Sequence, residues 1–201
     1  MRLALLILLV IPLGSVGAQR SPAEVRATVR ANSRYDATFK RYSKRYFGAG
    51  FDWSLFKAQA MAESELNPGA RSWVGARGLM QLMPSTFQEI QTKRPEFTSI
   101  DDPEWNIAAG IMHDRYLWRL WERDIGEDHR ASFMFGGYNA GEGTINRAAA
   151  AARASQLDAT QWPNIEQVAP SVPRWRYRET LGYVKKIDGN VAQLRGSKPR
   201  D

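Results

Sequence analysis

Carboxylates are the side chains in this 201-residue sequence that can support catalysis. The chain has no cysteine, and its two histidines, His113 and His129, lie neither near a Gly-x-Ser-x-Gly turn nor in a His-x-x-x-His or Glu-x-x-His pair. These patterns argue against a nucleophilic triad and against a metal site. The glycine-rich stretch lacks Gly-Lys-Ser/Thr, so it is not a phosphate-binding loop. We therefore expect acid–base chemistry by a carboxyl group, with no cofactor and no metal.

Glu63 is the carboxylate whose surroundings best suit this chemistry. It falls in the last turn of a helix expected to begin near Trp53, where the negative end of the helix dipole disfavours a negative charge. Its neighbours Met61, Ala62 and Leu66 are apolar, and burial beside them would raise its pKa further. A carboxylic acid that stays protonated near neutral pH is suited to general acid catalysis. On local grounds alone, a solvated surface glutamate is the alternative.

Helices are expected to position this residue, because few stretches alternate between apolar and polar residues as strands do. Helix starts are indicated by a capping residue or a proline at Ser21-Pro22, Asp52, Pro84 and Asp102-Pro103. Helix ends are indicated at Gly48-Ala49-Gly50, at Asn67-Pro68-Gly69 and, after a helix through Ala131 to Phe135, at Gly136-Gly137. We also expect a helix over Ala148 to Ala152, an irregular connection marked by Trp162-Pro163, Pro170 and Pro173, and a last helix from about Arg178 to Leu194. No repeat or long linker divides the chain.

The N-terminus has the pattern of a secretory signal peptide. Arg2 precedes an apolar run from Leu3 to Leu13, and Val16-Gly17-Ala18 is a small-residue cleavage site. The run is shorter than the roughly 20 residues of a spanning helix, so a retained anchor is the weaker interpretation. We expect a signal peptide at 1–18, a helical extension at 19–34, the catalytic domain at 35–194 and a polar tail at 195–201.

The composition suggests a basic exported protein that is stable without disulfides. The formal net charge is +7, or +6 once Arg2 is removed with the signal peptide. Such a charge attracts polyanions, among them cell-wall polymers, lipid head groups and nucleic acid, or it serves only solubility. Seven Trp, seven Tyr and eight Phe supply the bulk for packing in a chain without cysteine.

The residues that follow Glu63 resemble the signature of the soluble lytic transglycosylase family. They read Glu63-Ser64, then Asn67-Pro68-x-Ala70-x-Ser72-x-x-Gly75-Ala76-x-Gly78-Leu79-Met80-Gln81-Leu82-Met83-Pro84-x-Thr86. Three later blocks agree in the family's order: Asp102-Pro103-x-x-Asn106-Ile107-x-x-Gly110, Tyr138-Asn139-Ala140-Gly141 and Glu179-Thr180-x-x-Tyr183-Val184. The resemblance covers about residues 35 to 190. It implies an all-α, mostly helical member of the lysozyme-like α+β superfamily, similar to goose lysozyme: a single globular helical domain with a glycan-binding groove.

The resemblance also implies a role for each matching position. Glu63 is similar to the catalytic acid and base, Ser72 to the hydroxyl that hydrogen-bonds it, and Tyr138 to the tyrosine over the reacting sugar. The implied substrate-binding residues are Gln81, Met83, Asn139, Glu179 and Tyr183. For Tyr183, packing is the alternative, and for Glu179 a buried structural carboxylate bonded to backbone.

The family's reaction needs one carboxyl group where ordinary glycosidases need two. It implies cleavage of the β-1,4 bond between N-acetylmuramic acid and N-acetylglucosamine, with formation of a 1,6-anhydromuramyl end. A goose-type lysozyme-like hydrolase is the nearest alternative, with Glu65, Asp101, Asp102 or Glu142 as the second carboxylate that activates water. An alternative of another class is a non-catalytic protein that binds cell wall.

The implied partner is the glycan strand of peptidoglycan, not nucleic acid, and the implied enzyme is a monomer. It would be periplasmic or secreted after cleavage near Ala18. The sequence leaves open a peripheral association with a membrane or a secretion machine, and the choice between action at strand ends and within strands.

Overall fold

The computed structural model describes residues 33–196, and those from Tyr35 onward belong to one compact unit. The expected signal peptide, all but the last two residues of the expected extension, and the end of the polar tail lie outside the described residues. The first helix of the described residues, α2 (Asp36–Phe47), turns Phe39 and Tyr42 inward and ends at Gly48, whose φ is 99°. The glycine therefore ends the helix as expected, in a backbone conformation that other residues rarely adopt.

Helix α3 (Ser54–Ser64) carries Glu63 in its last turn. Asp52 accepts the backbone N–H of Ser54 at 3.0 Å, as a residue at a helix start is expected to do. The helix ends three residues before Asn67, because Glu65 and Leu66 adopt left-handed φ angles of 55° and 62°. The chain then turns back into an irregular loop that reaches Met83.

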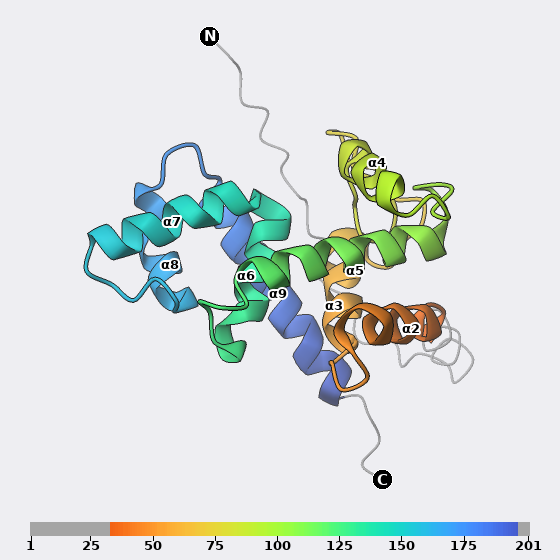
Figure 1. The fold of residues 1–201 in the computed structure, drawn as a ribbon, viewed down its shortest axis with the longest axis horizontal. Helices are drawn as coiled ribbons and strands as arrows, with labels where there is room; N and C mark the ends of the chain where they lie inside the picture. The colour runs from red at the N-terminus through yellow and green to blue at the C-terminus, as the bar shows by residue number, and fades with distance from the viewer. Residues whose placement is uncertain (1–32, 197–201) are drawn as a thin grey trace, which may run out of the picture. The chain divides into compact units, whose positions relative to one another are not determined.

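The next two helices begin where their prolines predict. Helix α4 (Pro84–Lys93) has its proline in the first turn. Helix α5 (Pro103–Leu120) is capped by Asp102, whose side chain accepts the N–H groups of Glu104 and Trp105. In the view of Figure 1, α4 and α2 lie above and below α5, and both pack against it. Helix α5 therefore lies between α2 and α4 and contacts both.

Helix α6 (Glu127–Ala140) continues through the two glycines at which the sequence predicted a break, so that prediction is wrong. A Cβ on Gly136 would lie 2.5 Å from the Trp162 ring, and one on Gly137 2.7 Å from the Trp121 ring. The glycines are present because two indole rings pack against the helix backbone. Their effect is on tertiary packing, which outweighs their low helix propensity.

The C-terminal part is also more regular than predicted. Helix α7 (Glu142–Ala154) contains the alanine run. The connection predicted to be irregular holds helix α8 (Trp162–Val168), with Pro163 in its first turn, and a 3₁₀ turn at Ala169–Ser171. Proline is compatible with a first turn, because no N–H is required there. Helix α9 (Tyr177–Gly196) extends two residues beyond the predicted end, and Arg195 forms an ion pair with Asp52 at 2.8 Å.

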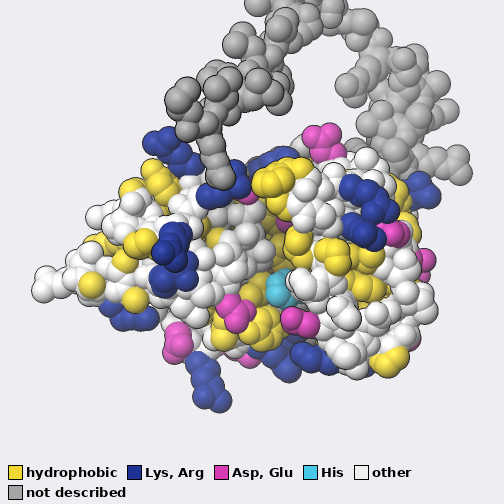
Figure 2. Space-filling view, turned by 90° about the horizontal axis from the view of Figure 1, so that it is seen from above, with side chains coloured by type: hydrophobic (Ala, Val, Ile, Leu, Met, Phe, Trp, Pro, Cys, Tyr) yellow, Lys and Arg dark blue, Asp and Glu magenta, His cyan; other side chains and the backbone are white. Residues whose placement is uncertain are grey.

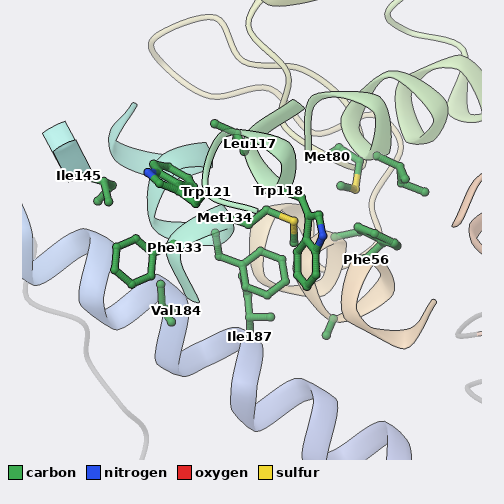
Figure 3. Packing of buried hydrophobic residues seen from close by; sticks show 14 of the residues in the cluster. Phe56, Met80, Leu117, Trp118, Trp121, Phe133, Met134, Ile145, Val184 and Ile187 are labelled. Carbon is green, nitrogen blue, oxygen red and sulfur yellow. The ribbon is translucent and has the colours of Figure 1, made fainter. Parts of the chain in front are cut away.

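The core lies where α3, α5, α6 and α9 meet. Figure 3 shows Phe56 of α3, Trp118 of α5, Met134 of α6 and Ile187 of α9 pointing toward one another. Trp118 is 9% exposed and the other three are fully buried. Helices α3 and α9 pack directly on each other through this core. The burial fixes the end of α3, and with it Glu63, against α9.

The described residues form eight α-helices and a 3₁₀ turn, and their β-pairing is limited to isolated bridges in the loop after α3. The mostly helical fold class predicted from sequence is confirmed. Within residues 33–196, no helix has both the length and the apolar composition needed to cross a membrane.

Candidate active site

Glu63 lies in the last turn of α3, and its half-buried side chain is hydrogen-bonded to Tyr183 of α9. Burial is the largest influence on this group and raises its pKa to about 7. Two smaller influences lower the pKa: a hydrogen bond from Tyr183 and the positive charge of Lys186. The group therefore holds its proton to near neutral pH and releases it close to neutrality. These are the properties of a residue that first donates and then accepts a proton.

One face of α9 holds the last two turns of α3. The Tyr183 hydroxyl donates to Glu63 Oε1 at 2.6 Å, Lys186 Nζ donates to the Ala62 carbonyl at 2.9 Å, and Asn190 Nδ2 donates to the Ala58 carbonyl at 3.0 Å. These three residues follow the three- and four-residue spacing of one helix face. That polar spacing is the signal from which a contact with α3 could have been predicted. From the sequence, Tyr183 was instead expected to contact substrate or to pack in the core.

The described structure has no hydrogen bond between Ser72 and Glu63, so the expected one stays a prediction. Its Oγ accepts the backbone N–H of Ala76 at 3.0 Å, and its own N–H donates to the Ala76 carbonyl at 3.0 Å. Serine side chains often bond to nearby backbone in this way, and here the bond closes the turn that ends at Gly75, whose φ is 94°. Among the described residues, Tyr183 is the sole hydrogen-bond partner of the Glu63 carboxylate.

Met80 connects the loop after α3 to helices α5 and α6 through its backbone hydrogen bonds. Its N–H donates to Asn106 Oδ1 at 2.8 Å, and its carbonyl accepts the Tyr138 hydroxyl at 2.8 Å. The Met80 side chain packs on Gly110, where a Cβ would lie 2.7 Å away. Tyr138 was expected over the reacting sugar, but its hydroxyl is used to hold the loop. Burial raises the pKa of Tyr138 well above its usual value, so it remains a hydrogen-bond donor.

Asn106 supports the same loop from α5. Its Nδ2 donates to the carbonyls of Arg77 and Ile100 at 2.9 and 3.0 Å. It also lies against Gly78, where a Cβ would come within 2.4 Å of the amide. Both the glycine and the asparagine are therefore required by close packing of the loop on the helix. The motif is apparent in the sequence, but this structural role of Asn106 is not.

The other residues predicted to bind substrate differ in how exposed their side chains are. Gln81 uses its Nε2 inside the loop, donating to the carbonyls of Ala70 and Gly78, whereas the Met83 side chain is exposed. Asn139 is exposed, and its Oδ1 accepts the Thr180 hydroxyl at 2.8 Å.

Glu179 is not the buried structural carboxylate that was one alternative. It is exposed and forms an ion pair with Arg176 at 2.9 Å. It also lines a cavity of about 230 Å³, together with Asn139 and Arg174. An ion pair within one helical turn at the surface is a local arrangement that contributes little to stability.

A second cavity, of about 320 Å³, opens between α4, α5 and the start of α7. It is lined by Thr86, Glu89, Ile90, Lys93, Met112, His113, Tyr116 and Glu142. The His113 ring lies 5.2 Å from the Tyr138 ring, which links this cavity to the loop anchor. Figure 2 shows a hollow with apolar walls, a histidine in it and charged side chains at its rim. This combination suits a sugar, which offers apolar faces and many hydroxyl groups.

Residues 39–160 match the transglycosylase SLT domain family. A membrane-bound lytic murein transglycosylase F of Shewanella pealeana is 32% identical over 164 residues, which cover 80% of this chain and 32% of that protein. A protein of the same name from Vibrio cholerae is 31% identical over 182 residues, covering 86% of this chain and 32% of that protein. The chain thus spans about a third of the length of these relatives.

Two solved structures have a similar fold. The 70 kDa soluble lytic transglycosylase of Escherichia coli has a TM-score of 0.57 at 27% identity, over 87% of this chain and 27% of that one. An inactive variant of the lytic transglycosylase Slt of Pseudomonas aeruginosa has a TM-score of 0.65 at 23% identity, over 85% of this chain and 26% of that one. The second likeness supports the fold alone.

Proposed function

Because the chain belongs to the transglycosylase SLT domain family, we propose that it is a peptidoglycan lytic transglycosylase. It would cleave the β-1,4 bond between N-acetylmuramic acid and N-acetylglucosamine and leave 1,6-anhydromuramyl ends. The observation that carries the proposal is the carboxyl group of Glu63, whose pKa is raised by burial to about 7 and which accepts a hydrogen bond from the Tyr183 hydroxyl. The catalytic domain would be residues 35–194.

In the proposed reaction, Glu63 acts twice. It first donates its proton to the glycosidic oxygen, and the bond from that oxygen to C1 of the muramic sugar breaks. The 2-acetamido group of the same sugar stabilises the positive charge that develops at C1. The muramic C6 hydroxyl then attacks C1, and the ionised Glu63 takes its proton. The hydroxyl of Tyr183 stabilises the carboxylate between the two steps, and no water is consumed.

The four carboxylates considered for a hydrolase support the transglycosylase instead. Asp101 pairs with Arg71 and Arg77, and Asp102 caps α5. Glu142 accepts a hydrogen bond from Tyr116 at 2.8 Å. Glu65 is exposed beyond the end of α3. A water-activating base needs a carboxylate that is free to accept a proton beside the reacting carbon. Among these four, Glu142 comes closest to meeting this requirement, because it lines the cavity of about 320 Å³ between α4, α5 and α7.

Product analysis on intact sacculi tests the proposal. We expect mass spectrometry to find 1,6-anhydromuramyl ends, 18 Da lighter than hydrolysed ends, in digests by the wild type and by Glu142→Gln alike. Reducing muramic ends in the wild-type digest would overturn the transglycosylase in favour of the hydrolase. If the hydrolysed product formed and vanished in Glu142→Gln, Glu142 would be identified as the second carboxylate. A wild type that releases nothing would indicate a protein that only binds cell wall.

Removing the Tyr183 hydroxyl is expected to shift the pH dependence of the reaction. The hydroxyl stabilises the ionised form of Glu63, so Tyr183→Phe should raise the Glu63 pKa above 7. The alkaline limb of the kcat profile then moves to higher pH, and kcat at its optimum falls about 10-fold because the carboxylate is less well stabilised. The measurement is initial rate against pH from 4 to 9.

Tyr42→Phe is the matched control for this substitution. The Tyr42 hydroxyl donates to Glu104 at 2.7 Å, which is the same kind of bond at a distance from the site. The control is expected to lose some stability and to keep the wild-type pH profile. If Tyr183→Phe also kept that profile, the hydrogen bond to Glu63 would have no role in catalysis.

The remaining roles follow from accessibility. Met83 and Asn139, which are exposed, would contact the glycan, and Glu179 would do so beside Arg176. Ser72 and Tyr138 would support catalysis by holding the loop. The substrate would be the glycan strands of peptidoglycan, met in the cell envelope, where the relatives' names place those proteins at the membrane. Export by the signal peptide at 1–18 and action as a monomer belong to the same proposal.

A further inference from the structure

Asp114 is a buried acid that the proposed reaction does not use. It lies in α5 with no exposed surface, and Gln59 of α3, also fully buried, faces it. Gln59 Nε2 donates to Asp114 Oδ1 at 3.2 Å. A fully buried aspartate is rare unless it is paired with a positive charge, and its hydrogen-bond partner here is an uncharged amide.

Asp114 and Gln59 each have one side-chain oxygen that accepts no hydrogen bond. Asp114 Oδ2 and Gln59 Oε1 are buried, and neither has a hydrogen-bond partner in the described structure. Two buried acceptors without a donor would be costly, because neither oxygen carries a proton that it could share. A proton on Asp114 Oδ2 removes both defects, since the acid then donates to Oε1 while Oδ1 accepts from Nε2. The result is a closed pair of two hydrogen bonds between an acid and an amide.

The groups around Asp114 favour this protonated form. Burial raises the pKa of Asp114 well above its usual value and outweighs the hydrogen bond from Gln59, which lowers it; the charge of Glu63 raises it further. Tyr138 of α6 and Tyr183 of α9 also interact electrostatically with Asp114. The charged groups of α2 and α4 near α5 act on other residues: Glu89 on His113, and Arg41 on Glu104. No cation among the described residues compensates a charge on Asp114.

The pair lies directly behind Glu63. Gln59 precedes Glu63 by four residues in α3, so both side chains leave the helix on the same face, one turn apart. We propose that Asp114 is a positioning residue for Glu63: as an uncharged acid bonded twice to Gln59, it fixes the turn of α3 that carries Glu63 and places no second negative charge behind it. The inference rests on the proposed role of Glu63. It adds a buried acid, held neutral, to a site whose motif contains a single carboxylate.

The protonation of Asp114 can be tested without any assay of activity. An acid that keeps its proton when folded and loses it when unfolded makes the protein less stable as pH rises above the unfolded pKa, near 4, toward the folded pKa. Asp114→Asn removes this loss and keeps both hydrogen bonds, because its Nδ2 donates to Gln59 Oε1. We expect equal melting temperatures for variant and wild type at pH 3.5, and a variant more stable by several degrees at pH 7.

Asp124→Asn, at an exposed carboxylate, is the control and should show a pH-independent difference from the wild type. If Asp114→Asn also differed from the wild type by a constant amount, or lost stability as pH rose, the neutral acid would be refuted. This result does not depend on which reaction the enzyme performs, so a failure of the proposed function would be seen separately, in the product analysis.

The positioning role is tested by the pH profile of kcat. Asp114→Leu leaves the Gln59 amide unpaired, and we expect kcat to fall at least 10-fold with little change in KM. Asp114→Asn should restore the lost rate with the alkaline limb at the wild-type pH. If Asp114 were ionised, Asp114→Asn would remove a negative charge and move that limb to lower pH. That shift, or an Asp114→Leu enzyme with wild-type kcat, would overturn the proposal.

Discussion

Glu63→Gln is expected to reduce the release of anhydromuropeptides by roughly 1000-fold or more, with an unchanged far-UV circular dichroism spectrum. Glutamine fills the same space and can still interact with the Tyr183 hydroxyl, but it can neither donate the proton that the glycosidic oxygen requires nor accept one from the C6 hydroxyl. Both proton transfers would fail together, because one group performs both. Initial rates on purified sacculi, supported by a peptidoglycan zymogram, measure the loss.

The same substitution is expected to stabilise the protein at neutral and alkaline pH. The pKa of Glu63 rises from 4.5 to about 7 on folding, so wild-type stability falls as pH increases from about 4.5 to 7. The shift corresponds to roughly 3 kcal/mol above pH 7 and to nothing below pH 4. Glutamine has no proton to lose, so Glu63→Gln should melt at a higher temperature than the wild type at pH 8 and at an equal one at pH 4.

Glu65→Gln is the matched control, because Glu65 is exposed two residues further along the chain. It should retain activity and show no pH-dependent gain in stability. Full residual clearing by Glu63→Gln would refute Glu63 as the acid and base. An inactive Glu63→Gln variant whose stability tracked the wild type at every pH would show that the Glu63 pKa is not raised on folding, and that its carboxyl group is solvated.

The helix starts were predictable from sequence because the signals are local. Pro84, Asp102 and Pro103 act within one turn of the helix they begin, and the structure places the starts of α4 and α5 at these residues. Gly136 and Gly137 were misjudged because their cause is remote. The Trp162 ring that requires Gly136 comes from another helix, so local propensity predicted a break where packing required a continuous helix.

The site shows the same division between local and remote causes. Glu63 was identified from its position in a helix and its motif, both of which are read within a few residues. Tyr183, its hydrogen-bond donor, is 120 residues away, and the Tyr138 hydroxyl reaches a carbonyl 58 residues away. Family resemblance indicated that these residues matter without indicating which atoms they contact. The Ser72 side chain closes its own turn.

Gln59 and Asp114 gave no signal in the sequence. Each is a polar residue within a helix, where a solvent-facing position is the ordinary expectation. Their burial depends on α3 and α5 packing together, which places the two side chains opposite each other although 55 residues separate them. The catalytic motif therefore identified the acid of the site, while the residues that set its position and electrostatic surroundings were visible only in three dimensions.

Asn106→Leu is expected to destabilise the protein by roughly 2–4 kcal/mol and to lower activity at least 10-fold at temperatures where the variant is still folded. Leucine has the branching and the number of heavy side-chain atoms of asparagine, although it is larger, and it makes none of its three hydrogen bonds. The Arg77 carbonyl keeps a second donor, the Leu82 N–H. The Met80 N–H would be left buried and unpaired, which costs about 1–3 kcal/mol, and the half-buried Ile100 carbonyl would lose its donor as well.

The loss of activity would arise through the loop. Met80 is held at its N–H by Asn106 and at its carbonyl by Tyr138, so removing the first bond frees one side of the residue that anchors the loop. Urea unfolding measures the stability, and hydrogen exchange of the Met80 amide should become faster in Asn106→Leu while core amides of α9 change little. Asn164→Ala, which removes a single exposed hydrogen bond, is the control. A stability within 0.5 kcal/mol of the wild type, the usual range for a surface substitution, would mean that the loop holds its conformation without Asn106.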